Sequence, residues 1–175
     1  RSIGAGRVVT DLLGHGVASL EHPAHRREMV EVVRALWRGG MVEHHGEFYD
    51  FDPVEMRPVP PAPVPIYVGG HSDIAFRRAA SIGDGWLGVY YSVEELIEHC
   101  ETLERAREDA GTADRPFEVI ASPLAAPNSE TCERLEAAGV TTILTSAWMA
   151  QGVAGPDSTE QAIELIGSFA DRFIP

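Results

Sequence analysis

Apolar residues recur with helical spacing along several segments of the chain. In residues 24–37 they follow the i, i+3, i+4, i+7, i+8 spacing of one helix face, and Gly39 marks the C-terminal end. Capping boxes that start at Ser92 and Ser158 predict the first turns of two more helices. The spacing predicts helices over residues 24–37, 73–82, 93–110 and 159–173, and a weaker one over 129–138.

Short apolar runs lie between these helices, and each is bounded by Gly, Pro or Asp. Such runs are typical of strands that are buried on both faces of a parallel sheet. The alternation of strands and helices predicts right-handed βαβ units and an α/β fold. The predicted strands cover residues 66–68, 86–89, 117–120 and 140–144.

Residues 41–65 interrupt this alternation. The run EHHGEFYDF predicts a β-hairpin that turns near Gly46. Residues 53–65 then contain six of the twelve prolines, which predicts a stiff, extended surface connection. We expect both segments to belong to a single domain over residues 1–175.

The strongest local signal is the run YVGGHSD over residues 67–73, at the junction of a predicted strand and a predicted helix. Gly69 and Gly70 let the backbone approach a ligand, and the helix start offers free N–H groups to an anion. These features fit a phosphate-binding turn. They fit equally a structural βα turn in which Ser72 or Asp73 is an ordinary N-cap.

Other short motifs allow a structural or a chemical reading. The residues at 83–86, GDGW, have the composition of a turn, and the GAG run at 4–6 resembles another strand end. Arg77 and Arg78 either reach an anion or face solvent. His15 is expected to be a solvated loop residue, with substrate contact as the alternative.

The seven histidines do not predict a metal site. The pair at positions 22 and 25 and the pair at 44 and 45 lack zinc-helix spacing and an evident third ligand. We expect His44 and His45 on the hairpin.

The composition excludes several classes of reaction and of binding partner. All 14 basic residues are Arg, so Schiff-base lysine catalysis and a Walker A loop are excluded. The net charge of −13 argues against nucleic acid and anionic membranes as partners. No apolar run reaches membrane-spanning length and no signal peptide is evident, so a cytoplasmic protein is expected. Cys100 and Cys132 are expected to be reduced.

Taken in order, these motifs resemble the bacterial luciferase-like monooxygenase family, in particular its branch that uses coenzyme F-420. The order is Gly-Ala-Gly, a helix ending in RALWRGG, the hairpin HGEFYDF, a proline-rich stretch, PIYVGGHS, FRRAA and GDGW. The resemblance implies a (β/α)₈ TIM-barrel fold of which the chain carries strands 4 to 8, their helices and a hairpin insertion.

The resemblance also implies site residues. The cofactor phosphate would be held at the C-terminal edge of the barrel, with other residues beside it and beside the ring system. The implied cofactor-binding residues are Gly69, Gly70, His71, Ser72, Gly85, Trp86, Gly4 and Gly6. The implied substrate-lining residues are Arg7, Tyr90 and Trp148.

Two departures from the family pattern affect the catalytic assignment. Some deazaflavin dehydrogenases of this family carry a catalytic Glu where this chain has Arg7. The first three strands, which supply ring-face contacts and a catalytic His, have no counterpart here, so no catalytic residue is assigned.

The leading hypothesis is an oxidoreductase that transfers hydride between F-420 and a small organic substrate, as a homo-oligomer such as a dimer. One alternative is an FMN-dependent monooxygenase that uses O₂. The others are a non-catalytic barrel fragment or scaffold, whose open strand edges other protein must cover, and a phosphate-binding barrel of different chemistry. Gly70→Val is expected to block the anion site while leaving the fold largely intact.

Overall fold

A computed structural model describes residues 2–4, 23–124 and 128–173. The chain divides into two compact units, residues 1–65 and residues 66–175, which we describe separately. No helix in the described ranges is long and apolar enough to cross a membrane.

The first unit is built around a hairpin and one helix. Strands β2 (Val42–His45) and β3 (Asp50–Arg57) pair antiparallel, and β1 (Ser2–Gly4) pairs parallel with β3, so the order is β1-β3-β2. Helix α2 (Pro23–Trp37) packs its apolar face on this sheet through Val32 and Leu36. The predicted helix and hairpin are therefore confirmed.

Pro53 lies inside β3, not at the start of the extended connection as predicted. Phe51 and Val54 pair with His44 and Val42, and the register shifts between them. Pro53 lies at this irregularity, where its missing N–H breaks no regular ladder hydrogen bond. The proline-rich connection accordingly starts only after Arg57.

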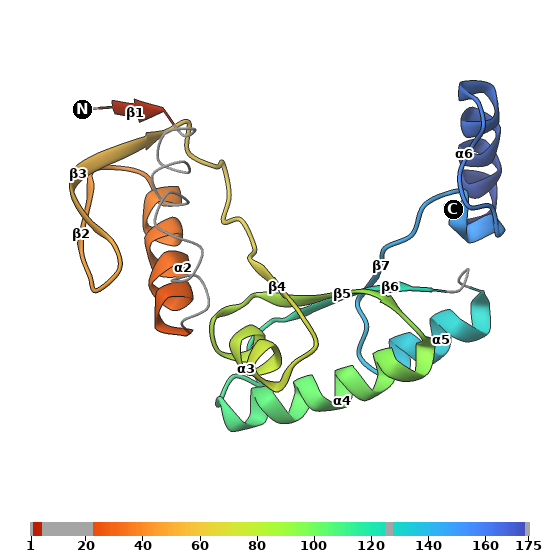
Figure 1. Ribbon diagram of the computed structural model, residues 1–175, viewed down its shortest axis with the longest axis horizontal. Coiled ribbons are helices and arrows are strands. Elements are labelled where there is room, and N and C mark those ends of the chain that lie inside the picture. Colours follow the sequence, from red (N-terminus) through yellow and green to blue (C-terminus); the bar gives the residue numbers. More distant parts are fainter. Residues whose placement is uncertain (1, 5–22, 125–127, 174–175) are drawn as a thin grey trace. The chain divides into compact units, whose positions relative to one another are not determined.

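The second unit is an α/β structure with a parallel sheet in the order β4-β5-β6-β7. The sheet is formed by β4 (Tyr67–Gly69), β5 (Gly85–Tyr91), β6 (Glu118–Pro123) and β7 (Thr142–Ile143). Between successive strands run α3 (Asp73–Ile82), α4 (Val93–Asp109) and α5 (Ser129–Ala137). These βαβ units confirm the predicted fold class, and every predicted helix is present (Figure 1).

The core of this unit lies between the sheet and the helices α3, α4 and α5, which cover one face of it (Figure 1). Trp86 from β5 and Leu96 and Leu103 from α4 are fully or almost fully buried there. Burying one such side chain contributes about 1.5–3 kcal/mol, so these residues set the helix positions.

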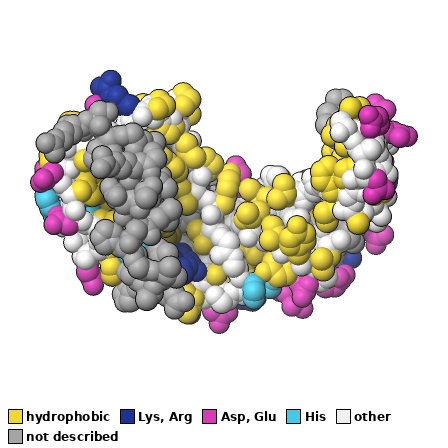
Figure 2. Space-filling view, turned by 45° about the horizontal axis from the view of Figure 1, so that its top comes forward, with side chains coloured by type: hydrophobic (Ala, Val, Ile, Leu, Met, Phe, Trp, Pro, Cys, Tyr) yellow, Lys and Arg dark blue, Asp and Glu magenta, His cyan; other side chains and the backbone are white. Residues whose placement is uncertain are grey.

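The opposite face of the sheet is less covered than the predicted strands suggested. Val89 is 41% exposed and Leu144, directly after β7, is 49% exposed. Figure 2 shows hydrophobic side chains gathered over this unit's sheet. The prediction that the strands are buried on both faces is therefore confirmed for the helix-covered face and wrong for the other one, because the helices between the strands all pack on the same side.

After β7 the chain forms the short 3₁₀ helix η2 (Met149–Gln151) and the helix α6 (Thr159–Phe173). The Gln151 amide donates to the carbonyl oxygen of Leu165 at 2.8 Å and so connects these two elements. The bounds of α6 match the prediction, but its apolar stripe is only half-buried at Leu165 and Phe169 and is exposed at Ile166.

Candidate cofactor-binding turn

The turn between β4 and α3 has the backbone geometry of an anion-binding site. Gly69 ends β4, Gly70 has φ +106°, and α3 begins at Asp73 with Ser72 as its N-cap. The Ser72 hydroxyl accepts the N–H of Ala75 at 3.3 Å. The first turn of a helix also presents N–H groups without helical acceptors, which an anion or water can take.

Charge at this turn is mixed. The positive end of the α3 dipole favours an anion, while the exposed carboxylate of Asp73, in the first turn, opposes one. Within residues 69–73 the groups that can donate to a phosphate are backbone N–H groups, the Ser72 hydroxyl and the His71 ring, and the cationic side chains of the following helix are Arg77 and Arg78 because the chain has no Lys.

The two glycines of the turn differ in how well the fold would tolerate a side chain. A Cβ on Gly70 would lie 2.9 Å from the Ala75 Cβ, and the positive φ strains any side chain there. A Cβ on Gly69 would meet only the Leu87 carbonyl oxygen, at 3.7 Å. This geometry argues against the expectation that Gly70→Val leaves the fold largely intact, and Gly69 is the better position at which to test the ligand with added bulk.

Trp86 stabilises the turn from the core of the unit. Its side chain is fully buried, and its indole N–H donates to the carbonyl oxygen of Gly70 at 2.8 Å. Trp86 thus positions the turn. Gly85 does not lie beside the turn, because it pairs with Tyr67 at the N-terminal ends of the two strands, whereas Gly69 pairs with Leu87 toward their C-terminal ends.

The Gly-Asp-Gly segment is a structural turn. The Asp84 carboxylate accepts the N–H of Ile66 at 2.9 Å, and its backbone N–H donates to the Ile66 carbonyl oxygen at 2.8 Å. A Cβ on Gly85 would overlap the Glu118 carbonyl oxygen. These contacts fix the start of β5 beside β4, so the structural reading of this motif is supported.

Beside the turn lies a cluster of rings that the sequence did not reveal. The Tyr91 hydroxyl is 2.9 Å from Nδ1 of His71. The ring of His99, from α4, stacks on the His71 ring with a centroid distance of 6.5 Å and contacts the Tyr91 ring edge-on with a centroid distance of 4.8 Å. His99 also contacts Phe76 and Trp86. We call these five residues the ring cluster; within it the exposed His71 side chain contacts Tyr91 and His99, and Phe76 and Trp86 support His99 from the core.

A β-bulge brings Tyr91 into this cluster. Tyr90 has φ +64°, unusual for a residue with a side chain, and the β5–β6 register shifts between Val89 and Tyr91. The shift places Tyr91 against Trp86 and the core, whereas Tyr90 is 64% exposed. The only sequence signal for Tyr91 is a pair of aromatic residues at a strand end.

Burial is the main cause of a lowered pKa at His99, and electrostatic repulsion by the nearby His71 ring lowers it further. Glu95 and Glu98 act in the opposite direction. His99 is therefore neutral at pH 7, which suits its position among the rings.

The other residues implied by the resemblance do not belong to the β4–α3 turn. Trp148 is half-buried and precedes η2, and Gly4 ends β1 in the sheet of the first unit. Gly6 and Arg7 lie outside the described residues.

The described histidines have local partners or lie in the core. His44 and His45 lie on β2, as predicted, and contact Glu28 and Asp50 respectively. His25 is buried and stacks on Tyr49. Across residues 2–4, 23–124 and 128–173, no group of three or more His, Cys, Asp or Glu side chains is arranged to hold a metal ion.

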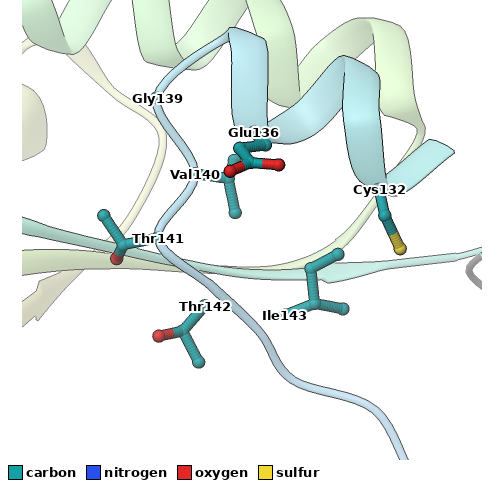
Figure 3. Close-up of a pocket in the computed structure, with 7 residues that line it drawn as sticks. All are labelled: Cys132, Glu136, Gly139, Val140, Thr141, Thr142 and Ile143. Carbon is teal, nitrogen blue, oxygen red and sulfur yellow. The ribbon is translucent and has the colours of Figure 1, made fainter. Parts of the chain in front are cut away.

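A separate pocket of about 450 Å³ lies beside α5 and the edge strand β7 (Figure 3). Cys132 and Glu136 line it from α5, and the segment from Gly139 to Ile143 forms its other wall. It contains none of the residues implied for the cofactor.

Comparisons with known proteins bear on the chemistry of this fold. A family model described as luciferase-like monooxygenase matches residues 2–172. An uncharacterized protein of Mycobacterium tuberculosis strain H37Rv is 38% identical over 149 residues, covering 84% of this chain and 51% of the relative. An F420-dependent glucose-6-phosphate dehydrogenase of Gordonia bronchialis is 32% identical over 100 residues, covering 57% of this chain and 29% of the relative.

Among solved structures, the coenzyme F420 dependent tetrahydromethanopterin reductase of Methanopyrus kandleri is similar in fold. Its TM-score is 0.60 at 16% identity, with 95% of this chain and 71% of that chain covered. A riboflavin lyase with modified FMN has a TM-score of 0.52 at 15% identity, over 74% of this chain and 35% of that one. The chain spans about half or less of the length of the curated relatives it matches.

Proposed function

Because the chain belongs to the luciferase-like monooxygenase family, we propose that it is the cofactor-phosphate-binding part of an F-420-dependent oxidoreductase. The observation that carries the proposal is the β4–α3 turn, in which Gly70 at φ +106° brings the backbone to the N-terminus of α3. The F420-dependent names of relatives such as the Gordonia dehydrogenase support the choice of cofactor.

In this proposal the chain's own residues bind and orient the phosphate. Backbone N–H groups at the start of α3, the Ser72 hydroxyl and His71 donate to it, and Trp86 keeps the turn in place. The cofactor, when bound, supplies hydride-transfer chemistry to a small organic substrate. Tyr90, exposed at the C-terminal end of β5, is a candidate substrate contact.

FMN is the second candidate cofactor, because a structural neighbour contains modified FMN. FMN also carries a phosphate on its ribityl chain, so the same turn would serve it. Its reduced form would react with O₂ and the protein would be a monooxygenase.

A titration distinguishes these readings. F-420 and FMN are each titrated into the 175-residue chain, and cofactor fluorescence and absorbance are followed. Saturable binding of F-420 without binding of FMN supports the proposal, and the reverse preference supports the monooxygenase. A folded chain that binds neither cofactor contradicts the proposal and favours a scaffold role.

A further inference from the structure

We propose that Tyr91 and His99 are positioning residues for His71, which they hold with Nδ1 occupied and Nε2 available to donate a hydrogen bond to the bound anion. The inference rests on the proposed function, since the anion is the cofactor phosphate at the β4–α3 turn. It assigns to the ring cluster a role that could not be predicted from the sequence motifs.

The hydrogen bond between Tyr91 and His71 selects a tautomer. A neutral imidazole has one donor nitrogen and one acceptor nitrogen. The Tyr91 hydroxyl lies 2.9 Å from Nδ1 of His71. When that hydroxyl donates to Nδ1, the ring proton is on Nε2, which then offers a donor to an anion. The other tautomer would present a lone pair at Nε2, which repels an anion.

Ring packing fixes the orientation of His71. The His99 ring lies nearly parallel to the His71 ring, with an interplanar angle of 18° and a centroid distance of 6.5 Å. It lies nearly perpendicular to the Tyr91 ring, with an interplanar angle of 89° and a centroid distance of 4.8 Å. His99 is in turn held against Phe76 and Trp86. Rotation of His71 away from the turn would give up both the stacking and the hydrogen bond.

The bulge at Tyr90 is a second, independent sign that Tyr91 is placed for a purpose. A residue with a side chain at φ +64° is strained and persists where its surroundings require that conformation. Without the extra residue, Tyr91 would lie on the same side of the sheet as Val89, away from the helices. The bulge instead places Tyr91 beside His71.

The charged and titratable groups around His71 come from three elements. Asp73 lies on α3, Tyr91 on β5 and His99 on α4, where Glu95 and Glu98 interact electrostatically with His99. Because His99 is neutral at pH 7, its ring supports His71 by packing and not by charge.

The test uses the 175-residue chain with ¹⁵N-labelled histidine and inorganic phosphate as the probe. NMR reports which nitrogen of His71 carries the proton, and phosphate titrations over a range of pH report affinity. The variant is Tyr91→Phe, which keeps the ring. The matched control is Tyr67→Phe, because the Tyr67 hydroxyl donates to Glu118, away from the turn.

We expect His71 in the original chain to carry its neutral-form proton on Nε2. We expect Tyr91→Phe to populate both tautomers and to weaken phosphate binding about fivefold, the loss of one neutral hydrogen bond. Tyr67→Phe should leave both readouts unchanged. An unaltered tautomer and affinity in Tyr91→Phe would overturn the role of Tyr91.

A second pair of variants tests His99. His99→Phe keeps a ring against His71 and should bind phosphate as the original chain does, whereas His99→Ala should bind it more weakly. Equal affinity in the two variants would overturn the packing role of His99. If phosphate shifts no resonance of residues 69–74 in the original chain, the proposed function fails instead, while the tautomer measurement still decides the role of Tyr91.

Discussion

The buried indole N–H of Trp86 donates a 2.8 Å hydrogen bond to the carbonyl oxygen of Gly70. A strand residue in the core thereby fixes the backbone of the turn that we propose as the phosphate site. The affinity of this turn for its ligand should depend on a side chain that solvent does not reach.

Trp86→Phe should lower both stability and cofactor affinity. The variant leaves the Gly70 carbonyl without its donor and removes buried volume, with an expected cost of about 1–3 kcal/mol in the free energy of unfolding. Denaturant unfolding and an F-420 titration measure the two effects. Leu96→Ala is the control, because it destabilises the same core without touching the turn. If both variants bind F-420 equally well, Trp86 does not position the turn.

Alanine substitutions at Gly70 and Gly69 should distinguish an effect on stability from an effect on ligand binding. Gly70→Ala should destabilise the chain by about 1–3 kcal/mol, because of its positive φ and its contact with Ala75. Gly69→Ala should change stability by less than about 0.5 kcal/mol, because its Cβ would meet only the Leu87 carbonyl oxygen at 3.7 Å. It should nevertheless weaken F-420 binding if the phosphate approaches the backbone at this glycine. Thermal unfolding with paired titrations checks this, and a Gly70→Ala chain as stable as the original would contradict the assigned conformation.

Glu28 should make the hairpin of the first unit sensitive to acid. Burial of Glu28 alone would raise its pKa, but hydrogen bonds from the N–H groups of Tyr49 and Phe48 and from His44 outweigh burial, and the pKa is lowered below 4.5. A lowered pKa in the folded state means that the carboxylate stabilises the fold fully above about pH 4.5 and that this contribution is lost as pH falls through the lowered value.

The measurement is a pH titration of the amide resonances of Phe48 and Tyr49, whose N–H groups donate to Glu28. The midpoint should lie below 4.5. Glu28→Gln should abolish this titration and destabilise the hairpin by about 1–3 kcal/mol, because the amide offers only one acceptor oxygen. A midpoint at or above 4.5 would show that the carboxylate is not held as described.

The two cysteines should differ strongly in reactivity. Burial raises the pKa of the Cys100 thiol to about 11, so about one molecule in a thousand carries the thiolate at pH 8. Cys132 is half-buried and lines the pocket beside β7. Iodoacetamide labelling followed by mass spectrometry should modify Cys132 first. Labelling of Cys100 at the same rate would contradict its burial on the core-facing side of α4.

Local patterns were enough to predict most of the elements. The helix spacing and the Ser92 box placed the bounds of α4 within one residue, and the side chains of Ser92 and Glu95 make both hydrogen bonds of the box. The hairpin was equally local, because Gly46 donates to the Tyr49 carbonyl oxygen across the turn. Pro53 was misplaced because tolerance of a proline in β3 depends on the irregular pairing with β2.

The candidate site was predictable only in part, for the same reason. The glycine turn is a contiguous motif and could be read directly. Tyr91 and His99 could not, since they meet His71 through a bulge in β5 and a face of α4 that no local pattern reports. Trp86 was expected to flank the ligand, which stays a prediction, and its hydrogen bond from the core to the Gly70 carbonyl oxygen could not be read from the sequence.

The most direct test of the central claim follows the backbone amides of the ¹⁵N-labelled chain as F-420 is added. The account predicts saturable shifts centred on residues 69–74 and on the indole N–H of Trp86, with the pocket at Cys132 and Ile143 unaffected. Shifts centred on that pocket, or none at residues 69–74 at saturating F-420, would contradict the assignment of the β4–α3 turn as the phosphate site.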